Sequence, residues 1–288
     1  AAAAGTHDLN DVTVIVVSFN SAHCMPRLGE LLRDFPHVSI VDNGSEDDTA
    51  HAVAEHLPQA LWLPQGRNLG FGTANNRALA LVRTPFALML NPDCELDAHS
   101  VRALLAVADQ FPEAALVAPQ LMQANGNPEV NYRWPGDHWK SAGPAATGTC
   151  CVGFICGAAI LARMHLFTRD DWFDERFFLY YEDDDLCLRL FQKQRGMLLA
   201  PHIHAIHRSR GSVRGKHPWR HEYVRGYHHA QSKLIFASKH QGIDQARTQR
   251  TRLLLGTLLA LPVRLLLPSP RLVTRMWGRL CGLIQWKP

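Results

Sequence analysis

A carboxylate placed directly after a buried strand could hold a divalent cation. Asp93 follows Asn91 and Pro92, and these three residues come after the apolar run 86–90. Hard cations such as Mg²⁺ and Mn²⁺ prefer oxygen ligands, and a bound cation can in turn hold a diphosphate. The same residue types also form ordinary turns that lead into helices, because Asn-Pro and Asp favour turn conformations. The segment is therefore compatible with a metal site and with a plain turn.

Four consecutive acidic residues, Glu182, Asp183, Asp184 and Asp185, form a second candidate site. They follow the apolar run 177–181, which we expect to carry them from the interior to the edge of a site. Crowded carboxylates in a partly apolar pocket raise one another's pKa, which prepares a general base. A purely structural role is the alternative, because acidic residues at the start of a helix are stabilised by the helix dipole.

Three histidines and several arginines occupy the segment 202–214. His202, His204 and His207 could mark one face of a strand, and a lone histidine is more often structural than a ligand. The arginines that follow could neutralise a leaving diphosphate. A solvated basic loop is an equal interpretation of those arginines, which are Arg208, Arg210 and Arg214.

The elements that would position these side chains alternate between strand and helix. Apolar runs predict strands, and apolar residues at helical spacing predict helices between them. Such alternation indicates a parallel sheet with right-handed crossovers, and ligands of such sheets bind beyond the carboxyl ends of the strands. The polar clusters 18–20, 42–45 and 91–93 lie at those ends. The predicted strands are 12–18, 38–41, 61–63, 86–90 and 115–118, and the predicted helices are 25–35, 45–56, 73–82 and 97–111. Ser45, with Asp48 three residues on, is expected to cap the second of these helices.

Several classes of protein are disfavoured by the sequence. There is neither a GxGxxG motif after the first strand nor a GxxxxGK[ST] motif, so a dinucleotide fold and a P-loop are unsupported. A nucleotidyltransferase would show a Gly-rich, basic triphosphate loop there. The formal charge of +4 is too small to indicate nucleic acid binding. Seven scattered cysteines without CxxC pairs disfavour structural zinc and are typical of a reducing, cytoplasmic environment.

The C-terminal region is basic and rich in leucine. From Gln241 onward there are eight Arg or Lys residues and one acidic residue, Asp244. Basic amphipathic helices can lie on an anionic membrane surface. A packed helical appendage or a dimer surface is about as well supported. The longest apolar stretch, 253–263, contains Pro262 and is too short to span a bilayer. After Trp219 the chain is expected to be helical to its end, with interruptions at Pro262, Pro268 and Pro270.

The order of the polar motifs resembles glycosyltransferase family 2, especially its bacterial rhamnosyltransferase-like group. The resemblance covers residues 12–212. It implies an α/β fold of the A-type glycosyltransferase class, with a mostly parallel central sheet flanked by helices and a helical C-terminal extension. It also implies a nucleoside diphosphate donor and inversion at the anomeric carbon. The segments that carry it are 14–20 (VIVVSFN), 41–45 (VDNGS), 68–72 (NLGFG) with Asn75 and Asn76, 91–93 (NPD) and 182–186 (EDDDL).

The resemblance assigns most of the donor site to the first half of the chain. By its pattern Asp42 contacts the base or ribose beside the main chain near Phe19, and glycines near residue 70 let the backbone approach the nucleotide. Asp93 and His207 are the expected ligands of Mg²⁺ or Mn²⁺. Asn91 replaces the first acid of the family's Asp-x-Asp motif, so we expect weak affinity for free metal. The full set expected to bind nucleotide is Phe19, Asn20, Asp42, Asn43, Ser45, Asn68, Gly70, Phe71, Asn75 and Asn91.

The resemblance also assigns catalysis and acceptor binding. Asp183 is the expected general base, with Glu182 as the second choice. Gly157, Ala158 and Asp185 are expected on the acceptor side, although Asp185 is also suited to orienting the helix. These assignments require Asp42, Asp93 and Asp183 to converge on one cleft.

The resulting hypothesis is a metal-dependent, inverting glycosyltransferase. Residues 10–240 would form the nucleotide-sugar-dependent domain, and residues 241–288 a basic amphipathic helical extension. The first choice of donor is dTDP-L-rhamnose, although related enzymes use UDP- or GDP-sugars. The acceptor would be a glycan or lipid-linked saccharide of the bacterial envelope, met in the cytoplasm or on the inner face of its membrane. The alternative is a catalytically inactive relative that binds sugar nucleotides or glycans.

Overall fold

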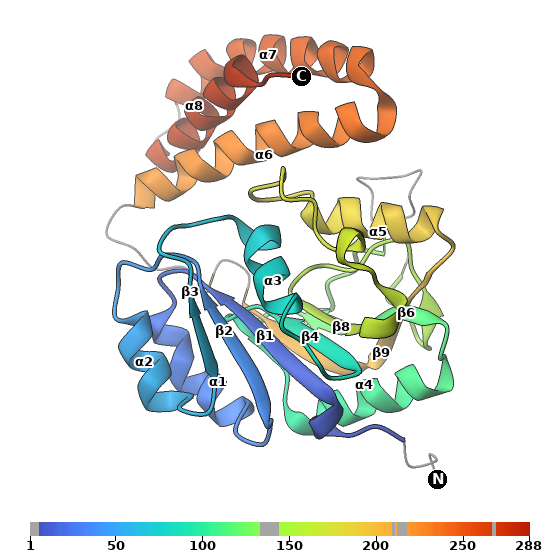
Figure 1. Ribbon diagram of the computed structural model, residues 1–288. Helices are drawn as coiled ribbons and strands as arrows, with labels where there is room; N and C mark the ends of the chain where they lie inside the picture. The colour runs from blue at the N-terminus through green and yellow to red at the C-terminus, as the bar shows by residue number, and fades with distance from the viewer. Residues whose placement is uncertain (1–5, 133–143, 209–210, 212–217, 267–268) are drawn as a thin grey trace. The chain divides into compact units, whose positions relative to one another are not determined.

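The computed structural model describes residues 6–132, 144–208, 211, 218–266 and 269–288, and the chain forms two compact units (Figure 1). The first, here called the sheet unit, comprises residues 1–69, 73–173 and 186–214. The second, the helical unit, comprises residues 70–72, 174–185 and 215–288. The predicted functional division into 10–240 and 241–288 stays a prediction.

A mixed sheet forms the centre of the sheet unit. Its strand order is β3-β2-β1-β4-β8-β6-β9-β5, and β7 pairs with β9. The pairs among β3, β2, β1 and β4 are parallel, whereas β8 runs antiparallel to both of its neighbours. The strands are β1 (Val12–Ser18), β2 (His37–Asp42), β3 (Leu61–Pro64), β4 (Phe86–Leu90), β5 (Cys94–Glu95), β6 (Ala114–Met122), β7 (Cys150–Cys151), β8 (Ala159–Arg163) and β9 (Gly196–His207).

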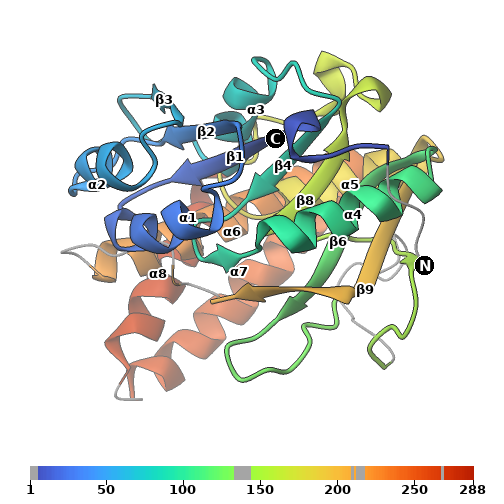
Figure 2. The same ribbon diagram turned by 90° about the horizontal axis from the view of Figure 1, so that it is seen from below.

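Helices α1, α2 and α4 cover one face of this sheet. They are α1 (Met25–Leu31), α2 (Thr49–His56) and α4 (Ala98–Gln110), and Figure 2 shows α1 and α4 along the strands. Their apolar side chains share a core with Val12, Val14 and Val16 of β1. Because side chains alternate along a strand, the intervening Ile15 points to the other face, where it is also fully buried. Burial on both faces explains the unbroken β-branched run of β1.

The parallel strands bring the predicted polar clusters to a single edge. Ser18 at the end of β1 is in register with Asp42 at the end of β2, and Ile15 of β1 is opposite Met89 near the end of β4. Parallel strands end on the same side of a sheet, so the residues after β1, β2 and β4 are neighbours there.

Two predicted features of the helices were wrong. Ser45 does not cap α2, which begins at Thr49, because the Ser45 hydroxyl instead accepts the backbone N–H of Asn20 at 2.9 Å. Pro262 does not interrupt the C-terminal helix and lies inside α7 (Ile243–Leu265). It leaves the carbonyl of Leu258 without its helical N–H partner, and this part of α7 is exposed, so water can hydrogen-bond there.

Three long helices make up most of the helical unit. They are α6 (Pro218–Gln241), α7 and α8 (Pro270–Gln285), which lie side by side in Figure 1. Leu234 of α6 and Leu283 of α8 are fully buried in their shared core, with Trp286 beside them. Among the helices that the structure describes, none combines the length and apolar character needed to cross a bilayer.

Glycines permit the close crossing of α6 and α8. A Cβ on Gly278 would lie 2.1 Å from the carbonyl oxygen of Tyr223, and one on Gly226 would lie 2.0 Å from that of Arg275. Both obstacles are backbone atoms, which a side-chain rotation cannot move. A Cβ on Gly256 of α7 would meet no atom within 4 Å.

Replacing Gly278 therefore tests the packing of this unit. We expect Gly278→Ala to destabilise it by about 1–3 kcal/mol, because the added methyl group overlaps the Tyr223 carbonyl. Gly256→Ala is the matched control, and we expect it to stabilise α7 by about 0.5–1 kcal/mol, as Ala for Gly does in an open helix position. Urea unfolding monitored by circular dichroism measures both. Equal stability of the two variants would contradict the close crossing.

Candidate functional site

Side chains beyond β1 and β2 bind one another's backbones at the edge of the sheet. Asn20, whose φ is 51°, donates its N–H to the Ser45 hydroxyl and accepts the N–H of Glu46 at 2.8 Å. Ser45 donates its own N–H to Oδ2 of Asp42 at 3.2 Å. The predicted nucleotide residues Asn20, Asp42 and Ser45 are thus held in one hydrogen-bonded group, and Phe19 adjoins it in the chain.

Asn43 extends this group to the segment after β3. Its side-chain amide donates to Asn68 at 3.0 Å, and its side-chain oxygen accepts the N–H of Leu69 at 2.7 Å. Gly44 between them has a φ of 79°, and a Cβ there would lie 2.7 Å from the backbone of Arg67. The close approach of these two loops therefore depends on glycine at position 44.

Asp42 retains an acceptor that the surrounding residues leave unused. The residue is 8% exposed, and within the described part of the chain its Oδ1 atom has no hydrogen-bond donor. A buried carboxylate oxygen without a donor is costly unless a ligand or water supplies one. The hydroxyl and N–H groups of a ribose or base are such donors.

Asp93 is held by backbone groups from the end of β9. Its Oδ2 accepts the N–H of Gly211 at 2.9 Å, and its carbonyl accepts the N–H of Arg208 at 2.9 Å. The carbonyl of Gly211 accepts a hydrogen bond from Nε2 of His23 at 2.6 Å. His23 therefore links the segment after β1 to Asp93, and it was not among the residues predicted from the sequence.

His207 lies between two carboxylates. Its Nε2 is 3.9 Å from Oδ1 of Asp93, and its Nδ1 is 3.6 Å from Oε1 of Glu129. Burial alone would lower the His207 pKa, but the contact with Glu129 and the charge of Asp93 raise it above its ordinary value. His207 does not share the face of His202 and His204 on β9. Those two are exposed, and His207 falls on the opposite face because side chains alternate along a strand.

This arrangement matches the usual surroundings of a metal-binding imidazole. One ring nitrogen faces a carboxylate that can orient it, and the other faces a carboxylate that can share a cation. The described residues contain no group of three His, Cys, Asp or Glu side chains placed to hold a metal ion, since Glu129 and Asp93 lie on opposite sides of the ring. Asp93 and Nε2 of His207 could supply two ligands, and the others would come from a diphosphate and water.

Asn91 is fixed to the segment predicted to line the acceptor side. Its N–H donates to the carbonyl of Ala158 at 2.9 Å, and Ala158, which lies between Gly157 and the start of β8, is fully buried. Gly157 and Ala158 therefore adjoin the residue that precedes Pro92 and Asp93.

Gly70 and Phe71, at the start of α3 (Phe71–Leu79), contact Phe178 within the helical unit. The N–H of Phe71 donates to the carbonyl of Phe178 at 3.1 Å, and a Cβ on Gly70 would lie 2.4 Å from the same oxygen. Gly70 also has a φ of 88°, so this approach requires glycine. The residues after Phe178 are anchored by the Ser232 hydroxyl of α6, which donates to the carbonyl of Leu179 at 2.9 Å.

The backbone is strained immediately before the acidic run. Tyr180 and Tyr181 have φ angles of 70° and 69°, which residues other than glycine adopt at a cost of about 1–3 kcal/mol each. Helix α5 (Glu182–Gln192) begins directly after them. The run 177–181 therefore leads into the acidic residues through a strained turn, and its delivery of them to the edge of a site stays a prediction.

The first two carboxylates of α5 have different surroundings. Glu182 is 6% exposed, and within the described residues its Oε2 has no hydrogen-bond partner. Burial, and then the charges of Asp183 and Asp184, raise the Glu182 pKa well above its ordinary value. Asp183 is partly exposed, and its Oδ1 accepts the N–H of Asp184 at 3.0 Å. Asp183 is thus the more accessible base.

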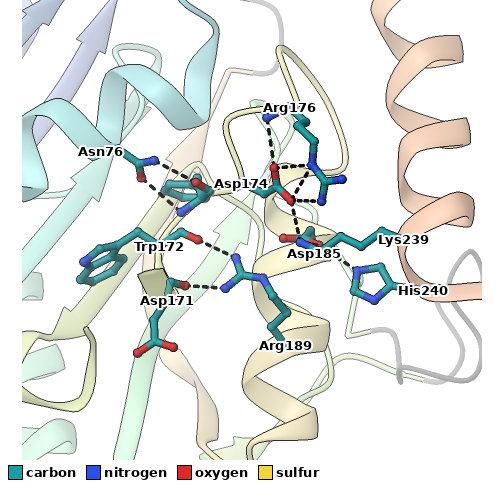
Figure 3. Close-up of polar contacts among 10 residues, drawn as sticks. Asn76, Asp171, Trp172, Asp174, Arg176, Asp185, Arg189, Lys239 and His240 are labelled. Carbon is teal, nitrogen blue, oxygen red and sulfur yellow. Dashed lines mark hydrogen bonds and ion pairs between the residues drawn. The ribbon is translucent and has the colours of Figure 1, made fainter. Parts of the chain in front are cut away.

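Asp185 is fully buried and bound to α6 (Figure 3). Its Oδ1 lies 2.6 Å from Nζ of Lys239 and 2.8 Å from Nε2 of His240. Lys239 also contacts Oδ2 of Asp174 at 2.7 Å, and Arg176 binds the same carboxylate. These contacts favour the helix-orienting role of Asp185, and acceptor binding by this residue stays a prediction. Lys239 and His240 were not identified from the sequence.

Asn76 and Arg189 bind backbone groups within the sheet unit (Figure 3). The Asn76 side chain both donates to the carbonyl and accepts the N–H of Phe173. Arg189 donates to the carbonyls of Asp171 and Trp172, at 2.6 Å each. Asn76 therefore has a structural role, and Asn75 beside it is 1% exposed.

The structure brings together the predicted residues of the sheet unit. Asn20, Asp42, Asn43, Ser45 and Asn68 share one hydrogen-bond group, and Asn91, Asp93 and His207 lie at the same edge. Glu182, Asp183 and Asp185 belong to the helical unit, so the convergence of Asp183 with Asp42 and Asp93 stays a prediction. Two further arginines with a predicted diphosphate role, Arg210 and Arg214, lie outside the described residues.

Curated relatives share sequence across most of the chain. An N-acetylglucosaminyl-diphospho-decaprenol L-rhamnosyltransferase of Mycobacterium tuberculosis is 28% identical over 236 residues, which are 71% of this chain and 76% of that protein. The rhamnosyltransferase WbbL of Escherichia coli K12 is 25% identical, over 68% of this chain and 83% of that protein.

Solved structures share the fold. A mannosyltransferase from Pyrobaculum calidifontis, in complex with GDP-mannose and Mn²⁺, aligns with a TM-score of 0.57 at 16% identity, covering 97% of this chain and 87% of that one. TarS of Staphylococcus aureus, residues 1–349 in complex with UDP-GlcNAc, aligns with a TM-score of 0.58 at 18% identity, covering 78% of this chain and 65% of that one. The predicted A-type glycosyltransferase fold, with its mostly parallel sheet and C-terminal helices, is confirmed.

The sequence also matches a family profile over residues 13–166, which contain the ends of β1, β2 and β4 and most of the polar groups described above. This match covers more than half of the chain, and the similarity to rhamnosyltransferases agrees with it. The chain therefore belongs to the family described as glycosyl transferase family 2, as its motif order predicted.

Proposed function

We propose that this glycosyltransferase transfers a sugar, with L-rhamnose from dTDP-rhamnose as the first choice, to a hydroxyl of a lipid-linked saccharide in envelope polysaccharide synthesis. The choice of sugar and acceptor is supported by the names of the relatives from M. tuberculosis and E. coli. The observation that carries the proposal is the pairing of Asp93, at the end of β4, with His207 beside the hydrogen-bonded strand ends.

The donor nucleotide would bind beyond β1 and β2. Oδ1 of Asp42 is buried and free to accept a hydrogen bond from the ribose or base, within the described residues. Asn20, Asn43 and Ser45 hold the surrounding backbone in place and so fix the direction of the Asp42 carboxylate.

Asp93 and His207 would hold a divalent cation together with the diphosphate. Mn²⁺ or Mg²⁺ bound there would offset the negative charge of the leaving diphosphate. Glu129 holds the imidazole through Nδ1, which leaves Nε2 directed at Asp93. With one carboxylate and one imidazole as protein ligands, we expect metal to bind mainly with the nucleotide.

Asp183 would act as the general base. As the acceptor oxygen attacks the anomeric carbon, its proton passes to the Asp183 carboxylate. The bond between that carbon and the diphosphate oxygen breaks, and its electron pair leaves with the nucleoside diphosphate. Attack from the face opposite the leaving group inverts the configuration. The partly exposed Asp183 fits this role better than Glu182, whose raised pKa favours the protonated form.

An inactive sugar-nucleotide-binding relative is the second candidate. Asn91 in place of an acidic residue favours it, whereas the strained turn before the intact acidic run opposes it, because strain of this kind is concentrated at functional sites. Acceptor-dependent release of a nucleoside diphosphate separates an active enzyme from this relative, and release of pyrophosphate would instead indicate a nucleotidyltransferase.

We also propose that the enzyme works at the inner face of the cytoplasmic membrane as a peripheral protein. The outer face of α7 supports this, because Leu255, Leu258, Leu259 and Val263 are all at least half exposed. Apolar helix faces with basic neighbours bind the interface of anionic bilayers.

Removing the proposed base should stop transfer and spare donor binding. We expect Asp183→Asn to lower turnover of dTDP-L-rhamnose by about 10²- to 10⁴-fold, the usual contribution of a general base. Asp184→Asn is the control, because it neutralises the neighbouring, partly exposed carboxylate. Nucleoside diphosphate release in the presence of a lipid-linked saccharide measures turnover, with UDP- and GDP-sugars compared in parallel. Normal turnover by Asp183→Asn would reject the assignment.

Removing the Asp93 charge should weaken metal-dependent nucleotide binding. We expect Asp93→Asn to reduce the affinity for dTDP in the presence of Mn²⁺ by about 10- to 100-fold and to leave metal-free affinity unchanged. Isothermal titration calorimetry with and without Mn²⁺ measures both values. Glu46→Gln, which removes an exposed charge near the same strand ends, serves as the control. An unchanged Mn²⁺ effect in Asp93→Asn would remove Asp93 from the metal site.

The raised pKa of Glu182 predicts a pH-dependent loss of stability. Between its ordinary value of 4.5 and its raised value in the folded state, the folded chain binds more protons than the unfolded chain. Stability therefore falls as pH rises through this window, by at most about 1.4 kcal/mol per pH unit. Glu182→Gln should lack this slope, while Asp184→Asn should keep most of it, because burial is the largest cause of the raised Glu182 pKa. Urea unfolding at pH 5 to 8 measures the difference, and parallel curves for wild type and Glu182→Gln would contradict the raised pKa.

A further inference from the structure

The helical unit contains a cavity lined by three arginines. Its volume is about 530 Å³, within the range of pockets that bind small molecules. Helix α6 contributes Gly226 and His229, and α7 contributes Gly256, Thr257, Ala260 and Arg264. Helix α8 contributes Leu272, Arg275, Met276 and Arg279. The cavity therefore combines cationic groups with apolar side chains.

The positive charge in this cavity is only partly balanced. Glu222 reaches Arg275 at 4.0 Å, but it also pairs with Arg225 at 3.0 Å. Neither Arg264 nor Arg279 forms an ion pair with an acidic side chain of the described residues. Guanidinium groups gathered in one cavity repel one another unless an anion lies among them.

The positive charges around the cavity also lower the pKa values of two neighbouring basic groups, His229 and Lys233. Burial, and then the positive charges of Lys233, Arg275 and Arg279, lower the His229 pKa to about 4. Burial, and then the charge of Arg279, lower the Lys233 pKa as well. A bound anion would offset this repulsion, and phosphate groups match the geometry of guanidinium forks especially well.

An apolar stripe runs along the exposed side of α7. Each of its residues has another member of the stripe three or four positions away, which places them on one helix face. The helix buries almost none of this face, and single residues are up to 86% exposed. The stripe consists of Leu255, Leu258, Leu259, Pro262, Val263 and Leu266. Ala260 and Arg264, which line the cavity, lie in the same turns of α7 as the stripe. Helix α7 therefore carries an apolar surface and a residue that can bind phosphate close together.

We propose that this cavity binds the diphosphate of a lipid, with the lipid chain lying along the apolar stripe of α7. Three arginines suit the charge of a diphosphate better than that of a single phosphodiester. The exposed leucines offer the apolar surface that a soluble diphosphate would not use. Leu272 and Met276 give the first carbons of the chain an apolar wall.

The cavity also adjoins the segment that carries the proposed base. The rings of Tyr180 and Tyr181 meet His229 edge-on, with centroids 5.4 and 5.7 Å away. Glu182 and Asp183 follow these tyrosines directly. Only the next step rests on the proposed function. If that function holds, the bound lipid diphosphate belongs to the acceptor, which is then held by the same unit that supplies the base.

Binding of farnesyl diphosphate to the full chain tests the site. We expect Arg264→Gln combined with Arg279→Gln to weaken binding at least tenfold, since each substitution removes a charge-assisted contact. Arg271→Gln, on the exposed side of α8, is the matched control and should bind normally. Isothermal titration calorimetry measures affinity, and circular dichroism confirms that each variant is folded. Inorganic pyrophosphate and farnesol, each lacking one half of the ligand, should bind at least tenfold more weakly than farnesyl diphosphate.

Three results would overturn the proposal. The first is equal binding of farnesyl diphosphate by wild type and the double variant. The second is equal affinity for pyrophosphate, which would show a site for free phosphates. The third is binding to phosphatidylglycerol nanodiscs, lost in the double variant, without binding of farnesyl diphosphate, which would show a site for bilayer lipids. The proposed function has a separate readout. If the chain showed no nucleotide-sugar turnover but still bound farnesyl diphosphate, the proposed function would fail and the proposed lipid diphosphate site would stand.

Discussion

Backbone groups that leave a parallel sheet need new hydrogen-bond partners where the strands end, and in this protein polar side chains supply them. Asn20 accepts the N–H of Glu46, Asp42 accepts that of Ser45, and Asn43 accepts that of Leu69. Because unpaired buried amides are costly, these bonds fix the loops that any ligand at this edge must meet. Oδ1 of Asp42 is also buried, but among the described residues it accepts no hydrogen bond from these loops. Stability of the edge and availability of a ligand acceptor thus come from one set of residues.

The strands and the strand-end clusters could be predicted because their signals are local. The β-branched run of β1 and the apolar run of β4 each predict a buried strand, and polar residues follow each run directly. The partners of those residues could not be predicted, because they lie far away in the chain. Glu129 contacts His207, and Gly211 contacts both His23 and Asp93. Local rules also failed for Ser45 and Pro262, where tertiary hydrogen bonding and exposure outweighed capping and helix-breaking tendencies.

The acidic run shows how one helix start can give identical groups different properties. Glu182 is buried, and within the described residues its Oε2 has no hydrogen-bond donor. Asp183 is partly exposed and accepts the N–H of Asp184. The charge of Asp185 is balanced by Lys239 and His240. The helix dipole acts on all of them, so it cannot be the source of the difference. Burial and specific partners are, and both follow from the turn at Tyr180 and Tyr181 that sets the direction in which α5 begins.

Positive charges are crowded in the cavity of the helical unit, in contrast to the negative charges at the start of α5. Its crossing of α6 and α8 is so close that glycine is required at positions 226 and 278, and this brings the arginines at 275 and 279 toward α6. A fold selected only for stability would relieve such crowding with acidic partners or apolar substitutions, because buried ion clusters contribute little net stability. The ligand that we propose for the cavity explains why these arginines are there. A phosphate-bearing ligand supplies the missing charge, and the apolar face of α7 limits that ligand to one with a hydrocarbon chain.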